Sequence, residues 1–318
     1  MTVYVLQRLA YVVAIMAIMS GLVFLSTHAL PENTAQVILG DYATPETQAA
    51  LEEKLGLNRP LLVQYGEWAG GLLHGDFGRS LILEQPIAPI LWAALAKSAI
   101  IAVAAMITVS IVGIALGVAA AVNYKRPFDY IASALTYLGL SVPEFFWGLI
   151  LILVFGSYFQ WFPTSGYSAP ADGIGVFLAH LALPVVTLTI GLQAHVSRLT
   201  RSSMLEALDS NYVRAARARG MPERIVILRH ALRNAMLPTI TVLAQDFGFL
   251  IGGIVAVETI FAYPGVGRLL VYSMSRHDLP LMQAAVLVIT AVYCLANLAA
   301  DLLYGVFNPR IRYGRAVE

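Results

Sequence analysis

Residues 98–122 read SAIIAVAAMITVSIVGIALGVAAAV, a run of 25 residues without a charged side chain. A helix crosses the ~30 Å hydrocarbon core of a bilayer with about 20 apolar residues, because each residue adds about 1.5 Å along the axis. The bilayer core offers no water to the backbone, so a run of this length is predicted to be helical. This stretch therefore predicts a transmembrane helix.

Five further apolar runs of similar length accompany it. They cover residues 9–30, 131–159, 176–197, 237–257 and 279–300. Pro143 and Glu144 interrupt the run at 131–159, and Asp246 interrupts the run at 237–257. The whole chain is 58% hydrophobic and 12% charged, whereas about 25% of the residues in soluble domains are charged. We predict an all-α membrane protein with six transmembrane helices.

The basic residues predict how the chain is oriented. Residues 198–236 contain eight arginines against three carboxylates, while residues 31–97 contain eight carboxylates against four basic residues. Lys and Arg are retained on the cytoplasmic side, so 198–236 and both termini are predicted to be cytoplasmic and 31–97 external.

The hydropathy divides the chain into residues 1–30, 31–97 and 98–318. An alternative for the first run is a signal peptide cleaved after the small-x-small sequence Thr27-His28-Ala29, but the run is longer than usual for one.

The predicted external segment carries helix signals of its own. Thr44 is a candidate N-cap followed by Pro45, Leu51 and Leu55 share a face, and Gly56 is a natural helix stop. Residues 60–74 form a second amphipathic stretch, and GDFGRS at 75–80 is typical of a turn. The segment is either a helical cap over the bundle or a docking surface for an external protein.

The arginine-rich loop predicts a rigid corner. Residues 212–219 are rich in helix formers, Gly220 is placed to end that helix, and Pro222 with Glu223 is typical of a new helix start. We name residues 211–224 the coupling knuckle. Its small alanines would let a partner approach the backbone closely. The alternative is an ordinary loop whose arginines only set the topology.

Several motifs resemble one family. YVRAARARG at 212–220 resembles the "EAA" loop of binding-protein-dependent ABC importer permeases, in particular the first (B-type) subunit of the dipeptide, oligopeptide and nickel group. The other matching segments are LGLNRP at 55–60, QY at 64–65, GDFGRS at 75–80, SVP at 141–143, RHALRN at 229–234 and ETIFAYPGVGR at 258–268. The resemblance covers nearly the whole chain in order. It implies the type I ABC importer permease fold, with 98–318 as the permease core.

The resemblance also implies partners. These are a homologous second permease in a heterodimer, two cytoplasmic ATPase subunits that receive the knuckle and hold ATP and Mg²⁺, and an external substrate-binding protein, all at the bacterial inner membrane. The residues implied to couple to the ATPase are Arg214, Ala215, Ala216, Arg217, Gly220, Pro222, Glu223 and Arg224. Two departures stand out: Arg214 occupies the position of the motif's Glu, and Leu237-Pro238 follows Gly220 by more residues than the family pattern has.

No catalytic motif is present in the sequence. The three lysines, Lys54, Lys97 and Lys125, are not in a phosphate-cradling Gly-Lys-Ser/Thr loop. We therefore expect a protein that is not an enzyme, with no cofactor, metal or nucleic acid bound by this chain. The energy must come from a partner or from an ion gradient, so a secondary transporter stays open as an alternative, and a channel is a third.

Two carboxylates are candidates for the translocation path. Asp246 falls near mid-depth of its run, where a charge facing lipid costs several kcal/mol, so it is expected to face a cavity or the bundle. Glu144 either faces the path or is a carboxylate stabilised at a helix N-terminus. Gln193 and His195 are interpreted as packing or interfacial groups. Within the resembling group the substrate stays open among peptides, nickel complexes, glutathione and other small solutes.

Overall fold

The computed structural model describes residues 2–28, 44–47, 49 and 58–307, and this part of the chain is helical with no strand. The helices are α1 (Thr2–His28), α4 (Leu61–Leu73), α5 (Ile87–Val122), α6 (Pro127–Ser141), α7 (Glu144–Leu151), α8 (Ile174–Asp209), α9 (Asn211–Ala218), α10 (Glu223–Ile225), α11 (Leu232–Ile260), α12 (Val266–Ser275) and α13 (Leu279–Phe307), with π-helical segments η2 (Ile152–Tyr158) and η4 (Val226–Ala231) and a 3-10 turn η3 (Pro170–Asp172).

The predicted membrane helices are confirmed. Helices long and apolar enough to span a bilayer lie at Val5–Thr27, Ile87–Val122, Ile174–Asp209, Glu223–Ile260 and Leu279–Leu302. A sixth span is present if α6 and α7 with η2 are counted together. The helix at 87–122 begins before the predicted run because residues 87–97 are apolar apart from Lys97. The helix at 174–209 continues past the predicted run through the more polar residues 198–209.

The predicted interruption at Pro143 is a sharp break. α6 ends at Ser141, Val142 is extended, and Pro143 is the N-cap of α7. Proline lacks an N–H and disfavours helical geometry in the residue before it, so the helix cannot continue. The two halves are bent by 105°, so this span is not a straight helix.

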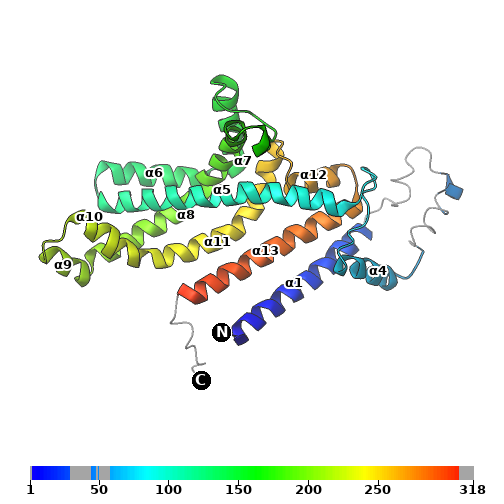
Figure 1. Cartoon of the computed structure of the whole chain (residues 1–318), viewed down its shortest axis with the longest axis horizontal. Coiled ribbons are helices and arrows are strands. Elements are labelled where there is room, and N and C mark those ends of the chain that lie inside the picture. Colours follow the sequence, from blue (N-terminus) through cyan, green and yellow to red (C-terminus); the bar gives the residue numbers. More distant parts are fainter. Residues whose placement is uncertain (1, 29–43, 48, 50–57, 308–318) are drawn as a thin grey trace. The chain divides into compact units, whose positions relative to one another are not determined.

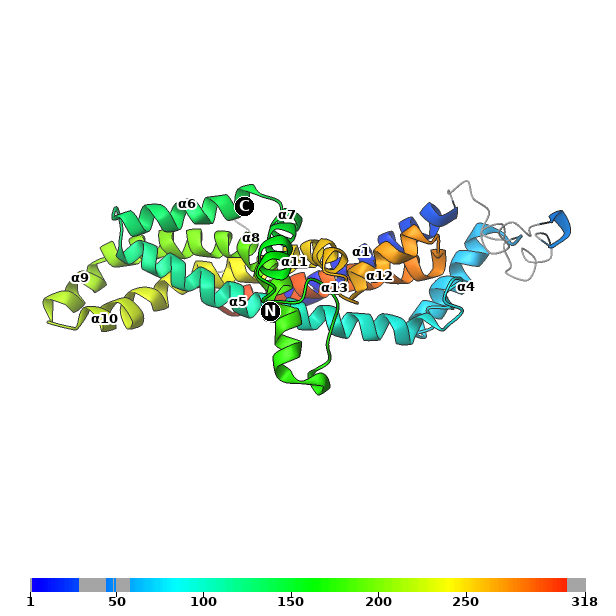
Figure 2. The same ribbon diagram turned by 90° about the horizontal axis from the view of Figure 1, so that it is seen from above.

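The described residues group into two compact units. The first consists mainly of Ala99–Tyr263, and the second of Leu6–Ser98 with Pro264–Cys294. This grouping follows contacts in space, and the division predicted from hydropathy at residues 30 and 97 stays a prediction. Within the first unit, α5 from residue 99 onward, α6, α8 and α11 run side by side, with α9 and α10 at one end (Figure 1 and Figure 2).

Two glycines set the contact between α5 and α8. A Cβ at Gly113 would lie 2.8 Å from the Val196 side chain, and one at Gly117 would lie 2.6 Å from the Ser197 carbonyl oxygen. Any other residue would push the helices apart, so the spacing of four residues marks a close helix crossing. The similar pair on α11 behaves differently, because Gly248 faces Asn297 whereas a Cβ at Gly252 would meet nothing within 4 Å.

The second unit contains the predicted 60–74 helix as α4 and the predicted turn after it. Gly75 and Gly78 have positive φ, and Gly78 N–H donates to Asp76 over 2.8 Å. The buried Asp278 carboxylate accepts hydrogen bonds from the Ser80 hydroxyl and, over 3.2 Å, from the Leu81 N–H. The turn is thereby fastened to the start of α13. The predicted cap at Thr44 is confirmed by the hydrogen bond from Thr47 N–H to Thr44 Oγ1, and Leu51, Leu55 and Gly56 lie outside the described residues.

Candidate functional site

The coupling knuckle is a hydrogen-bonded corner. After α9, Gly220 takes φ +73°, which glycine adopts without steric cost. Gly220 N–H donates to the Arg217 carbonyl over 2.9 Å, and Met221 N–H donates to the Ala216 carbonyl over 3.3 Å. This pair of bonds is the Schellman motif, so the predicted helix end at Gly220 is confirmed. Pro222 then serves as the N-cap of α10, which begins at Glu223, so the predicted helix start at these two residues is confirmed.

The inner face of the knuckle is packed into its own chain. Val213, Ala216 and Val226 are fully buried and join a cluster with Met204 of α8 and Ala121 of α5. The side chain of Ala216 is therefore covered inside the protein and cannot contact a partner, contrary to its predicted role at the surface. The burial of an alanine on this eight-residue helix depends on tertiary packing, which the local pattern does not reveal.

The outer face of the knuckle is exposed and positively charged. Its exposed residues include Arg214, Ala215, Arg217, Ala218, Arg219, Gly220, Pro222, Glu223 and Arg224. Arg214 pairs with Asp209 over 2.7 Å, and Arg217 pairs with Glu223 over 2.6 Å across the corner. Within the described part of the chain Arg219 and Arg224 form no ion pair. A partner would therefore meet two uncompensated guanidinium groups beside a strip of small side chains.

Both arms of the knuckle continue directly into long helices. Ser210 alone separates α8 from α9. On the other side α10 runs through η4 into α11 without a break, so the second short helix that we predicted is the beginning of a helix that ends at Ile260. The knuckle is thus the tip of a helical hairpin made by α8 and α11.

The same hairpin carries a pair of polar side chains in its membrane part. His195 Nδ1 on α8 lies 3.3 Å from Asp246 Oδ1 on α11, within hydrogen-bonding distance. Asp246 is only 2% exposed, and its Oδ2 has no hydrogen-bond partner among the described residues. Asp246 is buried in the bundle and also lines the cavity described below, so both of the environments we expected are found. His195 was interpreted from the sequence as a packing or interfacial group, and the structure makes it the partner of Asp246.

Glu144 lies against the same two helices. It is the first residue of α7, next to the N-cap Pro143, where the helix dipole stabilises a carboxylate. Its carboxylate fills the space beside Gly253 on α11 and Gly191 on α8, since a Cβ at Gly253 would lie 2.1 Å from Glu144 Oε2. The structure thus places both candidate path carboxylates against α8 and α11.

A polar cavity of about 420 Å³ opens beside His195 and Asp246. Its lining comes from one face of each helix: His195, Arg198, Leu199 and Ser202 on α8, and Val242, Gln245, Asp246 and Phe249 on α11. Both sets follow the i, i+3, i+4, i+7 spacing of one helix face. That shared spacing is the sequence signal that would have pointed to His195, Arg198 and Gln245.

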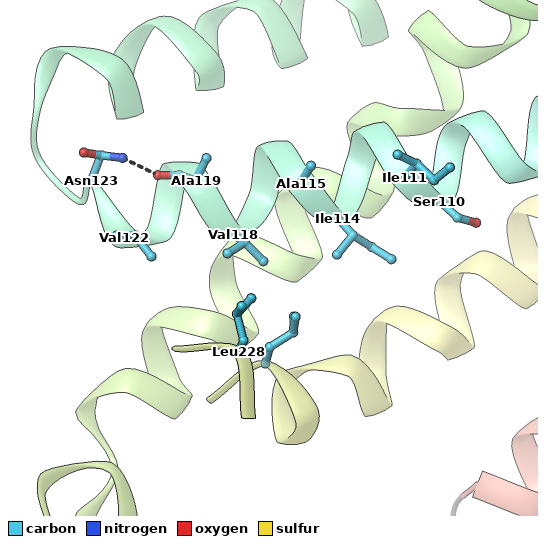
Figure 3. Close-up of a pocket in the computed structure, with 10 residues that line it drawn as sticks. Ser110, Ile111, Ile114, Ala115, Val118, Ala119, Val122, Asn123 and Leu228 are labelled. Atoms are coloured by element: carbon cyan, nitrogen blue, oxygen red, sulfur yellow. Dashed lines mark hydrogen bonds between the residues drawn. The ribbon is translucent and has the colours of Figure 1, made fainter. Parts of the chain in front are cut away.

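A second, apolar groove of about 470 Å³ runs along α5 toward Leu228 and Leu232 (Figure 3). Figure 3 shows Ile114 and Val118 of α5 directed toward Leu228 across this groove. Asn123, at the end of α5, donates its amide N–H to the Ala119 carbonyl over 2.8 Å (Figure 3). The groove has few polar groups with which to hold a solute, so the cavity at Asp246 is the candidate solute site.

An ion pair that the sequence reasoning missed fastens α6 to α8. Arg201 donates to both carboxylate oxygens of Asp129, over 2.6 and 2.8 Å, and stacks over the Tyr124 ring at 5.5 Å. A bidentate pair of this kind fixes orientation as well as distance. It holds α6 beside the arm of α8 that leads to the knuckle.

Comparison with known proteins identifies the family. Residues 113–313 match the family described as binding-protein-dependent transport system inner membrane component, and residues 1–104 match the N-terminal family of the same membrane components.

Three curated relatives span nearly the whole chain. The chain is 39% identical over 313 residues to a probable peptide ABC transporter permease of Sinorhizobium fredii (98% of this chain, 100% of the relative). It is 37% identical over 333 residues to a dipeptide transport system permease of Alkalihalophilus pseudofirmus (98% and 100%). It is 38% identical over 310 residues to a glutathione transport system permease of Salmonella choleraesuis (98% and 99%).

The fold also matches a solved structure, that of a methionine ABC transporter in inward-facing conformations, at a TM-score of 0.57 and 15% identity, over 69% of this chain and 96% of that one. The chain therefore belongs to the family of binding-protein-dependent transport system inner membrane components, the multi-pass permease subunits of ABC transporters.

Proposed function

We propose that this chain is one of two homologous permease subunits of an ATP-driven importer in the bacterial inner membrane, and that it moves di- or oligopeptides or similar small solutes into the cytoplasm. In this arrangement both termini and residues 198–236 are cytoplasmic, and residues 31–97 are external. Two ATPase subunits bind ATP and Mg²⁺ on the cytoplasmic side, and an external binding protein delivers the solute.

The proposal for coupling rests on the construction of the knuckle. Its inner face is buried in the chain, its outer face presents alanines and arginines, and both of its arms enter membrane-spanning helices without a flexible linker. A partner that moves the knuckle therefore moves α8 and α11. This continuity is the single observation that carries the coupling role of residues 211–224.

The proposal for peptides rests on the relatives. Those compared above are named for peptides, dipeptides and glutathione, which is itself a peptide. Each of these substrates carries ammonium and carboxylate groups, for which a path containing Glu144 and Asp246 is chemically suited. A nickel complex or another small solute of the same group is the alternative.

The coupling role is tested by placing a charge on the exposed side of the knuckle. Ala215→Glu is the suitable change, because Ala215 is exposed while Ala216 is buried and its replacement would damage the knuckle itself. Asn234→Glu adds the same charge at an exposed position outside the knuckle and serves as the control.

We expect Ala215→Glu to lower substrate-stimulated ATP hydrolysis and uptake by about tenfold or more at normal membrane levels, as for the loss of a buried interface contact. Asn234→Glu should retain both activities. Wild-type uptake by the Ala215→Glu complex would contradict the docking of an ATPase at this face.

A further inference from the structure

Asp246, which lines the cavity, carries an unsatisfied acceptor. Asp246 Oδ2 is buried and receives no hydrogen bond from any described residue, although Oδ1 lies beside His195. A buried carboxylate oxygen without a donor costs free energy that a donor-bearing ligand recovers on binding. The site is therefore prepared for a group that brings several N–H donors.

The opposite charge is present on the facing helix. Arg198 lines the same cavity, its side chain is exposed, and it forms no ion pair with any residue that the structure describes. No ion pair joins Arg198 to Asp246 in the described chain, so both charges are available to a ligand. The volume of about 420 Å³ lies within the range of small-molecule sites.

We propose that this cavity is a transient binding site for a zwitterion with a primary ammonium group and a carboxylate, as in an amino acid or a short peptide. The ammonium donates to Asp246 Oδ2 and to the side-chain amide oxygen of Gln245. The carboxylate accepts from the guanidinium of Arg198. The inference rests on the proposed function and names the substrate class of its translocation path.

The position of the site in the hairpin explains why binding there is transient. Among the described residues, those that line the cavity belong to α8 and α11, the two helices that lead to the knuckle. A displacement of the knuckle changes the spacing of Arg198 and Asp246, and with it the affinity. A conducting path needs this property, since a solute has to be held weakly enough to leave.

The experiment measures equilibrium binding to the assembled complex of both permeases and both ATPases in nanodiscs, without the binding protein. Omitting that protein removes its own selection. The probes are radiolabelled L-alanyl-L-alanine, its N-acetyl derivative, which lacks the ammonium, and its C-terminal amide, which lacks the carboxylate.

We expect wild-type complex to bind the dipeptide about tenfold more tightly than either derivative, as for the loss of one charge-assisted hydrogen-bonded contact. Asp246→Asn should abolish the preference over the N-acetyl derivative and keep the preference over the amide. Arg198→Gln should do the reverse. Glu206→Gln, which removes an exposed carboxylate on α8 outside the cavity, should keep both preferences.

Equal binding of all three probes by wild type, no saturable binding at all, or retention of both preferences in both variants would overturn the proposal. If Asp246→Asn does not assemble, Arg198→Gln decides alone, because its side chain is exposed and not needed for packing. The proposed function is tested separately, by ATP-dependent uptake in the presence of loaded binding protein. If this uptake occurs and Ala215→Glu lowers it, the proposed function stands even when the zwitterion site fails.

Discussion

Arg217 and Glu223 close the knuckle at the level of single side chains. Two hydrogen bonds join them, Nη2 to Oε1 over 2.6 Å and Nε to Oε2 over 3.2 Å. The hydrogen bonds between them raise the pKa of Arg217 and lower the pKa of Glu223. Both side chains are about half exposed, and such pairs contribute about 0–1 kcal/mol to stability. The main effect of this ion pair is to fix the geometry of the corner.

A charge exchange tests this role. Arg217→Glu and Glu223→Arg alone should each lower substrate-stimulated ATP hydrolysis severalfold, because like charges then face each other across Gly220. The double variant restores the pair in reverse and should recover at least half of the activity, with ATP hydrolysis of the purified complex as the measurement. A double variant no better than the weaker single variant would show that the two residues contact the partner individually.

Local sequence patterns predicted some residues and missed others for a physical reason. Gly220 was predictable because only glycine adopts positive φ without cost at the end of a helix. The burial of Ala216 was not, since alanine is common both inside proteins and on exposed helices. The pairing of His195 with Asp246 joins residues 51 positions apart, and no local pattern encodes such a contact.

At the level of helices, the α5–α8 crossing depends on the absence of a single methyl group. The Cβ of Gly117→Ala would lie 2.6 Å from the Ser197 carbonyl oxygen, an atom of the backbone that cannot swing aside. We expect a loss of about 1–3 kcal/mol in the free energy of unfolding, as for other overpacked cores. Thermal unfolding of the purified chain in detergent is the measurement.

Gly252→Ala is the matched control for this loss. Gly252 also lies in a spanning helix, but its added Cβ meets nothing within 4 Å. The change should be neutral or stabilise the chain by about 0.4–1 kcal/mol, because alanine loses less backbone entropy on folding. Equal effects of the two substitutions would mean that the close crossing does not depend on Gly117.

Hydropathy predicted which elements exist and failed where an element continues beyond its apolar part. The second arm of the knuckle looked like a separate short helix because residues 224–233 contain three arginines and a histidine. In the structure the same residues continue as α10 and η4 into α11, since their buried side chains pack on α5 and α8. The break at Pro143 was predictable, whereas no local pattern gives its angle of 105°.

For the whole molecule, the number of membrane crossings depends on the bent pair of α6 and α7. If the pair crosses, Lys125 and Ser165 lie on opposite sides of the membrane, with Ser165 on the side of His74 and Lys125 on the side of Gly220. If it re-enters, Lys125 and Ser165 share a side. The predicted location of both termini in the cytoplasm requires six crossings.

Single cysteines at His74, Lys125, Ser165 and Gly220, in a Cys294→Ser background, distinguish these topologies. We expect a membrane-impermeant thiol reagent to label the first and third positions in intact cells, and the other two only after permeabilisation, because Lys and Arg are retained inside. All four positions lie in turns or loops, so labelling reports their access to solvent. If the cysteines at Lys125 and Ser165 behave alike, both labelled in intact cells or both labelled only after permeabilisation, the six-span topology is refuted.

The two arms that leave the knuckle differ in stiffness. Between the knuckle and His195, α8 is an uninterrupted helix, since its proline, Pro184, comes earlier in the chain. Between the knuckle and Asp246, the other arm contains the π-helical η4 and Pro238, both of which are places where helices bend. A push on the knuckle should therefore travel along α8 as a rigid displacement and be partly absorbed in the second arm. The cavity between the arms would then be sheared, with Arg198 sliding past Asp246, instead of simply widening.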